Sequence, residues 1–125
     1  MRLVPLRHLP PSLGLLLRRP AAASLFIYTG LAVAAHWALV LATADYSDQA
    51  TVLHYNAYFG IDRVGTWREA LVVPAVATAI WLGDAAAAAW LMRRDHWLAQ
   101  GMVLAGAVAA TLLLAVTIAV RYQFT

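Results

Sequence analysis

The sequence contains neither cysteine nor lysine, and only 12% of its residues are charged. The absence of cysteine excludes disulfides, thiolate nucleophiles and metal sites ligated by cysteine. No glycine-rich phosphate loop, serine nucleophile elbow or HExxH pattern occurs either. What fills the chain is apolar, because 63% of its 125 residues are hydrophobic and the mean hydropathy is +0.71. This composition is far more apolar than that of an ordinary soluble domain.

Three long apolar runs dominate the chain: Ser24–Thr43, Ala70–Met92 and Ala99–Val120. Each has about 20 residues or slightly more, which as a helix crosses the roughly 30 Å hydrocarbon core of a bilayer. Helices satisfy their own backbone hydrogen bonds in lipid, and three segments are too few to close a barrel. The sequence therefore predicts an all-α fold, a three-helix bundle forming one integral membrane domain over residues 1–125.

The first run also has some features of a signal peptide. Ala42-Thr43-Ala44 is similar to a cleavage site, and arginines precede the apolar stretch. The apolar core of a signal peptide usually has about 7–15 residues, however, and this run is close to 20. We therefore expect an uncleaved first helix, with cleavage after Ala44 as the alternative.

All nine basic residues are arginines, and their distribution predicts the orientation of the chain. Six of them precede the first run or follow the second, namely Arg2, Arg7, Arg18, Arg19, Arg93 and Arg94. By the positive-inside rule, residues 1–23 and the turn 93–98 are cytoplasmic, and the loop 44–69 and residues 121–125 lie outside. The other three, Arg63, Arg68 and Arg121, lie on the predicted outer side, where the loop also holds four acidic residues. The net charge of +3 then reflects membrane topology and anionic lipid, so we expect a multi-pass protein of a bacterial inner membrane and no nucleic-acid partner.

Shorter patterns refine this picture. Prolines exclude a long helix before the first run, but Ser12–Arg19 can form a short helix whose leucines lie in the headgroup boundary. Pro20 and Pro74 stand where a helix tolerates proline, in the first turn. Each apolar run also carries small residues at every fourth position, which would permit close helix packing.

Polar residues inside the apolar runs are the first candidates for function. An aspartate such as Asp84 costs about 2.5–3.5 kcal/mol at the centre of a membrane helix, so we expect it to face the bundle. The helical rise puts His36 within roughly 6 Å of the level of Asp84, with Thr111 near His36. These residues form either a layer that accepts protons or binds a ligand, or a packing device held by hydrogen bonds, and we favour the latter.

Cofactors are not expected. A b-type haem held between helices usually needs two histidines at similar depth, and His36 has no such partner. His54 and Asp62 share the loop but lack a third metal ligand at a recognised spacing.

The most distinctive sequence of the chain lies in the long loop and reads LHYNAYFGIDRVGTW, from Leu53 to Trp67. We expect a short helix or an extended segment over Thr51–Phe59 and a turn at Gly60, with the whole loop folded down onto the helix ends because its aromatic rings are costly to expose. The loop either seals the bundle or binds a partner. The candidate residues for partner binding are His54, Tyr55, Asn56, Tyr58, Phe59, Gly60, Asp62 and Trp67.

The segment LHYNAYFGID, followed by Val64-Gly65-Thr66-Trp67 and Pro74, resembles a group of small bacterial membrane proteins that share a loop of the form LHYNxYFGID after their first span. The likeness covers about residues 31–120 and includes a polar residue in the second span and the turn Arg93-Arg94. It departs from the group at Asp84, where asparagine is usual, and in the alanine-rich spans. The group has no established activity, so the resemblance implies a topology and no reaction.

Three functions remain open at this point. The first is a non-enzymatic membrane protein that binds a membrane-protein partner or a lipid through its aromatic outer loop. The second is an oligomeric transporter or channel for ions or small molecules, in which Asp84 lines an interior shared between copies, since three helices are too few to enclose a pathway. The third is a membrane enzyme acting on a lipid through His54, Asp62 or Asp84.

Overall fold

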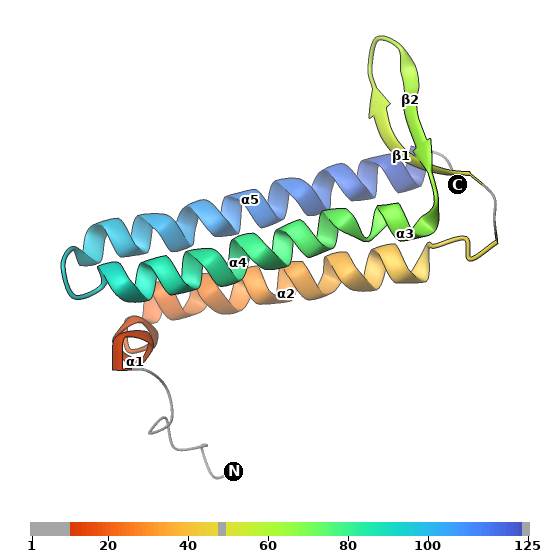
Figure 1. The fold of residues 1–125 in the computed structure, drawn as a ribbon. Helices are drawn as coiled ribbons and strands as arrows, with labels where there is room; N and C mark the ends of the chain where they lie inside the picture. The colour runs from red at the N-terminus through yellow and green to blue at the C-terminus, as the bar shows by residue number, and fades with distance from the viewer. Residues whose placement is uncertain (1–10, 48–49, 124–125) are drawn as a thin grey trace.

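The computed structural model describes residues 11–47 and 50–123. Residues 1–10 of the predicted N-terminal segment, residues 48–49 of the loop and residues 124–125 lie outside this part. Three long helices lie side by side (Figure 1), namely α2 (Pro20–Ala42), α4 (Val72–Leu91) and α5 (His96–Gln123). The smaller elements are α1 (Pro11–Leu17), β1 (Thr51–Asn56), β2 (Gly60–Gly65) and α3 (Trp67–Ala70).

The long helices are those of a multi-pass membrane protein. Pro20–Ala42, Trp67–Leu91 and His96–Gln123 are each long and apolar enough to cross a membrane. Large apolar side chains such as Leu31 and Leu112 are more than half exposed on their outer faces, as expected for surfaces that contact lipid. The prediction of three apolar helices is therefore confirmed, although each begins a few residues earlier than the apolar run.

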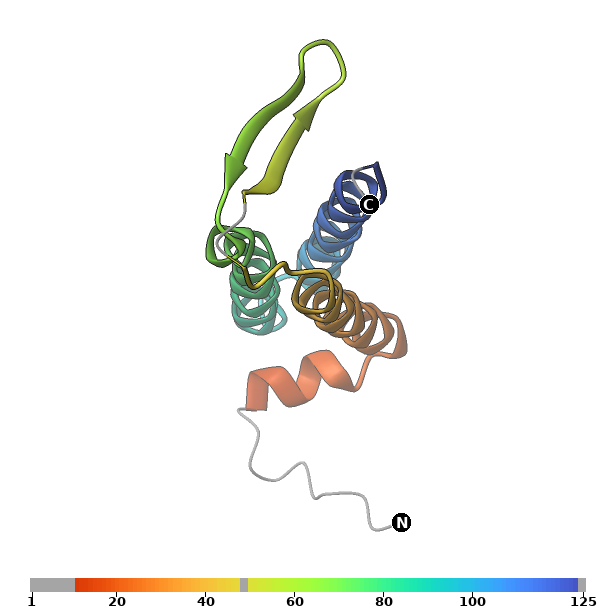
Figure 2. The same cartoon turned by 90° about the vertical axis from the view of Figure 1, so that its right-hand side faces the viewer.

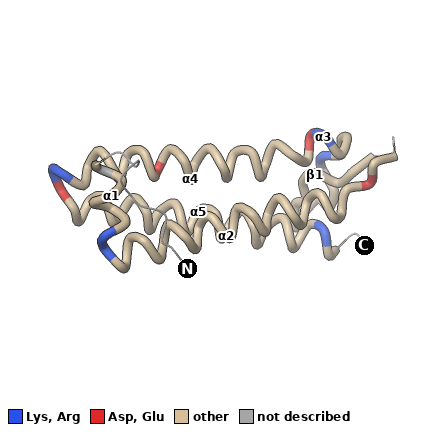
Figure 3. The backbone as a smooth tube through the Cα atoms, turned by 90° about the horizontal axis from the view of Figure 1, so that it is seen from below, with Lys and Arg blue, Asp and Glu red and all other residues tan. Residues whose placement is uncertain are grey.

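Charge gathers at the two ends of the bundle (Figure 3). We call one end the arginine end, because Arg18, Arg19, Arg93 and Arg94 lie there, beside α1 and the α4–α5 turn. The other, where β1 and β2 meet the end of α2, α3 and the end of α5, is the hairpin end.

Proline determines where two of the helices begin. Pro20 occupies the first turn of α2, where a missing N–H costs little. Pro74 lies in the first turn of α4, and in a continuous helix its ring would collide with the carbonyl group of Ala70. Helix α3 accordingly ends at Ala70 and α4 begins at Val72.

The bundle packs through small side chains, but not those at every fourth position. Most of that series is exposed, including Ala34, Ala38, Ala75, Ala79 and Ala105, so the close packing that their spacing permits does not occur along these faces. The core instead forms two clusters. One lies toward the arginine end (Leu16, Ala22, Ala88, Met92, Ala99, Val103) and one in the middle (Ala32, Val33, Ala77, Ala110).

Helix α1 confirms the short helix expected before the first span. Its Leu16 is fully buried in the cluster at the arginine end, whereas Leu15 is exposed. The helix is therefore anchored to the bundle through Leu16, which corrects the expectation that its leucines all lie in the headgroup boundary.

The connection between α2 and α4 is where the all-α prediction is wrong. It contains an antiparallel hairpin in which β1 pairs with β2, for example Val52 with Val64 and Asn56 with Gly60. The turn is as predicted: Gly60 has φ +77°, a conformation that disfavours a side chain, and the Tyr58 N–H donates a 2.9 Å hydrogen bond to Asn56 Oδ1.

The hairpin runs across the bundle axis and projects sideways beyond the helices (Figures 1 and 2). Its tip does not fold down onto them, since Tyr58 and Phe59 are 92% and 85% exposed. The prediction of a loop packed throughout on the helix ends is thus wrong for the tip. The base of the hairpin, by contrast, lies against the helices, where Val52, Leu53 and His54 of β1 share a cavity with residues of α4 and α5.

Candidate functional site

Asp84 faces the interior of the bundle. Its carboxylate lies against Gly106 of α5, where a methyl group in place of the glycine hydrogen would collide with it. Around the carboxylate, Phe26, Thr29 and Trp81 line the same small space. The predicted direction of Asp84 is confirmed, and Gly106 is the feature that allows α4 and α5 to approach so closely.

The other two candidates of the polar layer lie elsewhere. His36 Nε2 is 2.8 Å from Thr117 Oγ1, and the Tyr28 hydroxyl is 2.7 Å from Thr111 Oγ1. His36 is seven residues beyond Thr29, which is roughly 10 Å further along α2. A single polar layer containing Asp84, His36 and Thr111 is therefore wrong. The polar groups form separate contacts at different depths.

These contacts are interhelical hydrogen bonds. Thr111 donates its own hydroxyl proton to the Ala107 carbonyl, so Tyr28 is the donor in their pair. Trp37 Nε1 likewise donates to Thr78 Oγ1 at 2.9 Å. His36 is fully buried, and its Nδ1 has no hydrogen-bond partner among the residues that the structure describes. Such bonds hold helices together in lipid, which fits the packing role favoured from the sequence.

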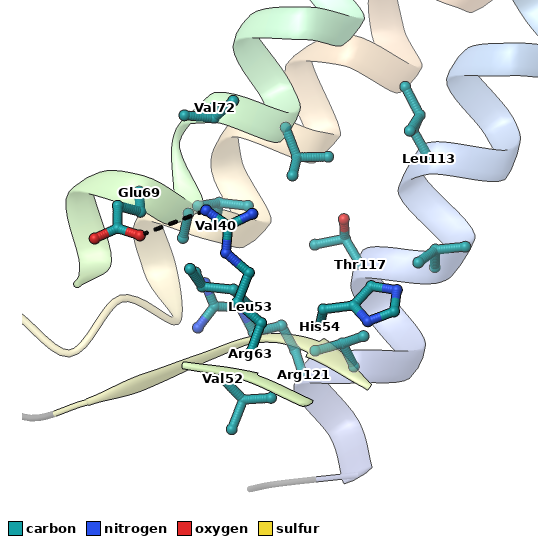
Figure 4. Close-up of a pocket in the computed structure, with 14 residues that line it drawn as sticks. Val40, Val52, Leu53, His54, Arg63, Glu69, Val72, Leu113, Thr117 and Arg121 are labelled. Carbon is teal, nitrogen blue, oxygen red and sulfur yellow. Dashed lines mark ion pairs between the residues drawn. The ribbon is translucent and has the colours of Figure 1, made fainter. Parts of the chain in front are cut away.

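A cavity of about 670 Å³ lies at the hairpin end, among the residues that the structure describes (Figure 4). The core cluster that contains Ala77 and Ala110 lies in the middle of the bundle. Between this cluster and the hairpin, the helices leave a space that no side chain fills. Val40 of α2 lies at the back of the cavity and is buried. The remaining apolar lining of the cavity comes from α3 and α4 (Ala70, Val72, Val73), from α5 (Leu113, Val116, Val120) and from β1 (Val52, Leu53).

Charged and polar side chains surround the part of this cavity that lies next to the hairpin. His54 and Arg63 are cross-strand partners, so both stand on the hairpin face that is turned toward the helices. Arg63 Nη2 lies 3.9 Å from Glu69 Oε2, the ion pair drawn in Figure 4. Arg121 enters from the last turn of α5, and Thr117 connects the cavity wall to His36.

Of the seven loop candidates whose side chains the structure describes, only His54 lines the cavity. Asn56 and Gly60 shape the turn, Tyr58 and Phe59 form the exposed tip, and the side chain of Asp62 lies outside the described part. Tyr55 belongs to β1 and is about one-third exposed.

Trp67 lies at the base of the connection. Its ring meets Tyr46 with centroids 5.1 Å apart, and the Arg68 guanidinium lies 5.5 Å from the Trp67 ring. In the same connection, hydrogen bonds from Ser47 lower the pKa of the Asp45 carboxyl below its ordinary value. Trp67 therefore packs the start of α3 against the end of α2 and takes no part in the cavity.

The sequence did not single out Arg63, Arg121 and Thr117 as site residues. One signal was present, because Arg121 directly follows the last apolar run on the side that the positive-inside rule assigns to the outside. Nothing in the sequence indicated that α4 and α5 enclose a cavity beneath the hairpin, since this depends on how the two helices are spaced.

No protein-family model, curated protein or solved structure matches the chain. The resemblance to the LHYNxYFGID group stays a prediction. No cluster of three His, Asp or Glu side chains within residues 11–47 and 50–123 could hold a metal ion. The geometry thus defines a class: three packed helices long and apolar enough to cross a membrane, with an apolar cavity beneath a hairpin.

Proposed function

We propose that this protein binds a membrane lipid in the cavity at the hairpin end, without catalysis. The observation that carries the proposal is the cavity itself, which is apolar along the helices and polar only beneath the hairpin. A lipid is divided in the same way: its acyl chain would fit the apolar part between the helices, and its headgroup would fit the polar part beneath the hairpin. The volume of about 670 Å³ lies within the range of about 300–1,000 Å³ that is typical of small-molecule sites.

The exposure of the lining residues supports entry from the bilayer. Val72 and Val116 line the cavity from α4 and α5, yet they are 59% and 58% exposed. The cavity is therefore open along the outer faces of these helices, which in a membrane lie against lipid tails. An acyl chain can move into it sideways without crossing water.

We further propose that the hairpin end lies outside the cytoplasm of a bacterial inner membrane and the arginine end inside. Reporter fusions test this orientation: a fusion at Asp95 is expected to report the cytoplasm and one at Gly60 the outside, because six of nine arginines flank the inner ends of the spans. The opposite pair of reporter signals would overturn the orientation.

The exposed tip of the hairpin supports the same proposal. Tyr58 and Phe59 project sideways from the bundle at the level of the helix ends, where aromatic rings are favoured in the headgroup layer. In this position they anchor the hairpin over the cavity mouth. A membrane-protein partner held by the same two rings is the alternative.

The transporter alternative finds less support. It needs Asp84 on a surface shared between copies, but the Asp84 carboxylate lies against Gly106 of its own bundle. A carboxylate in this position joins helices of one chain and is not available to line a pathway between copies.

Filling the cavity tests lipid binding. The chain is placed in vesicles that contain phosphatidylcholine with a photoactivatable acyl chain, and the labelled peptides are identified by mass spectrometry. In the unaltered protein we expect labelling at Leu113 and Val116. Val73→Trp is expected to reduce it severalfold, because the indole occupies the cavity.

Val76→Trp is the matched control, since Val76 is exposed on the same helix and does not line the cavity. This variant should leave the labelling at Leu113 and Val116 unchanged. Equal labelling in both variants and the unaltered protein would contradict the proposal.

A further inference from the structure

Among the lining residues that the structure describes, those in the polar part of the cavity carry an excess of positive charge. Two of its lining residues are arginines, Arg63 and Arg121, and one is a glutamate, Glu69. Two positive charges less one negative charge leave an excess of one, with His54 counted as neutral. Asp45, the other acidic residue of the hairpin connection whose side chain the structure describes, does not line the cavity. A ligand headgroup held here therefore meets a locally positive wall.

Arg63 is only loosely held by its glutamate partner. The 3.9 Å separation from Glu69 is at the outer limit of an ion pair, and the two side chains are 69% and 49% exposed. An exposed pair of this kind contributes little stability. A phosphate oxygen can therefore take the place of the carboxylate, and the planar guanidinium suits the two oxygens of a phosphodiester.

Arg121 approaches the same space from another element. It stands in the last turn of α5, one turn beyond Thr117, and lines the cavity beside the base of the hairpin. In Figure 4, Arg63 extends from β2, and Arg121 also lies next to the hairpin. The apolar residues Val72 and Leu113 of α4 and α5 lie further from the hairpin. A group between the two arginines would thus be at headgroup level, with its tail directed along the helices.

We propose that the lipid bound in the cavity is a net-anionic phospholipid, whose phosphodiester lies between Arg63 and Arg121 and one of whose acyl chains lies between α4 and α5. This inference rests on the proposed function, because it names the class of lipid that the same cavity takes. A zwitterionic lipid brings a cationic group toward two arginines and is disfavoured. The long-chain anionic lipid of the leaflet at the hairpin end is thus the occupant, and free phosphate lacks the chain that fills the apolar part.

The test compares two photoactivatable lipids that have identical acyl chains, phosphatidylglycerol and phosphatidylcholine. Each is added in trace amount to phosphatidylcholine vesicles that contain the full chain. We expect about fivefold more labelling of Leu113 and Val116 by phosphatidylglycerol, as one arginine contact near a membrane surface favours an anionic lipid by about that factor. Raising the ionic strength should reduce the preference.

The variant Arg63→Gln/Arg121→Gln is expected to lose this preference and to keep its labelling by phosphatidylcholine. Arg68→Gln is the matched control, because Arg68 lies at the same end but does not line the cavity. It should keep the full preference.

The outcomes separate the two proposals. Equal labelling by the two lipids in the unaltered protein, or a preference retained in the double variant, would overturn the inference while lipid binding stands. If neither lipid labels Leu113 and Val116 above the level of exposed Leu31 on α2, the proposed function fails with it.

Discussion

Replacing Trp81 by alanine is expected to lower the free energy of unfolding by about 3 kcal/mol or more, as truncation of a packed tryptophan does in folded cores. The indole of Trp81 joins α4 to α2. Its ring centroid is 5.0 Å from that of Phe26, and its Nε1 donates a 3.2 Å hydrogen bond to the Phe26 carbonyl. It also fills the space above Gly30, where even a methyl group would come within 2.8 Å of the ring.

The measurement is denaturant-induced unfolding in mild detergent. Trp90→Ala is the control, since Trp90 lies on the same helix but is mostly exposed beside Arg94, whose guanidinium is 4.3 Å from the ring. It should change stability much less than Trp81→Ala. If the two variants are destabilised equally, the contact of Trp81 with α2 does not hold the helices together.

Gly106→Leu is expected to separate α4 from α5. The new side chain would enter the space of the Asp84 carboxylate, where no room exists even for a methyl group. Overpacking of this kind costs about 1–3 kcal/mol, and here it also forces a carboxylate to move within the apolar bundle. We therefore expect a lower unfolding midpoint in detergent and less protein in the membrane fraction.

Gly101→Leu provides the comparison on the same helix. Gly101 is exposed, and nothing lies within 4 Å of the position that a side chain would take first. It should fold like the unaltered protein. A Gly106→Leu variant as stable as Gly101→Leu would mean that α4 and α5 do not approach closely at this level.

The sequence was sufficient to predict the features that depend on local composition. Apolar runs of membrane length predicted the three long helices, Pro74 predicted a helix start, and Gly60 predicted a turn with positive φ. Asp84 was expected to face the bundle because lipid solvates a carboxylate poorly. All of these follow from single residues or short windows.

The features it could not predict depend on how the helices are rotated and spaced. Depth along each helix suggested that His36 and Asp84 share one level, but His36 meets Thr117 and Asp84 meets Gly106. The packing face of each helix was equally hard to predict. An alanine-rich helix has small side chains on several of its faces, and residue spacing alone does not show which face packs against a neighbour. An extended segment over Thr51–Phe59 was one of the two predicted alternatives, and β1 confirms it. Its pairing with β2 was missed, because aromatic residues at a membrane boundary suggest contact with the helices more readily than a strand pair.

Helix α1 and the hairpin both run across the bundle axis, at opposite ends and on opposite sides (Figures 1 and 2). Between them α4 has 20 residues, or about 30 Å of helix, which matches the hydrocarbon core. A bundle of bare helices adapts to a thicker or thinner bilayer by tilting. In this protein, tilting would carry one crosswise element into the hydrocarbon, where the unpaired edges of the hairpin would lose their contact with water. The two crosswise elements are therefore expected to limit how far the molecule can tilt in a bilayer of different thickness.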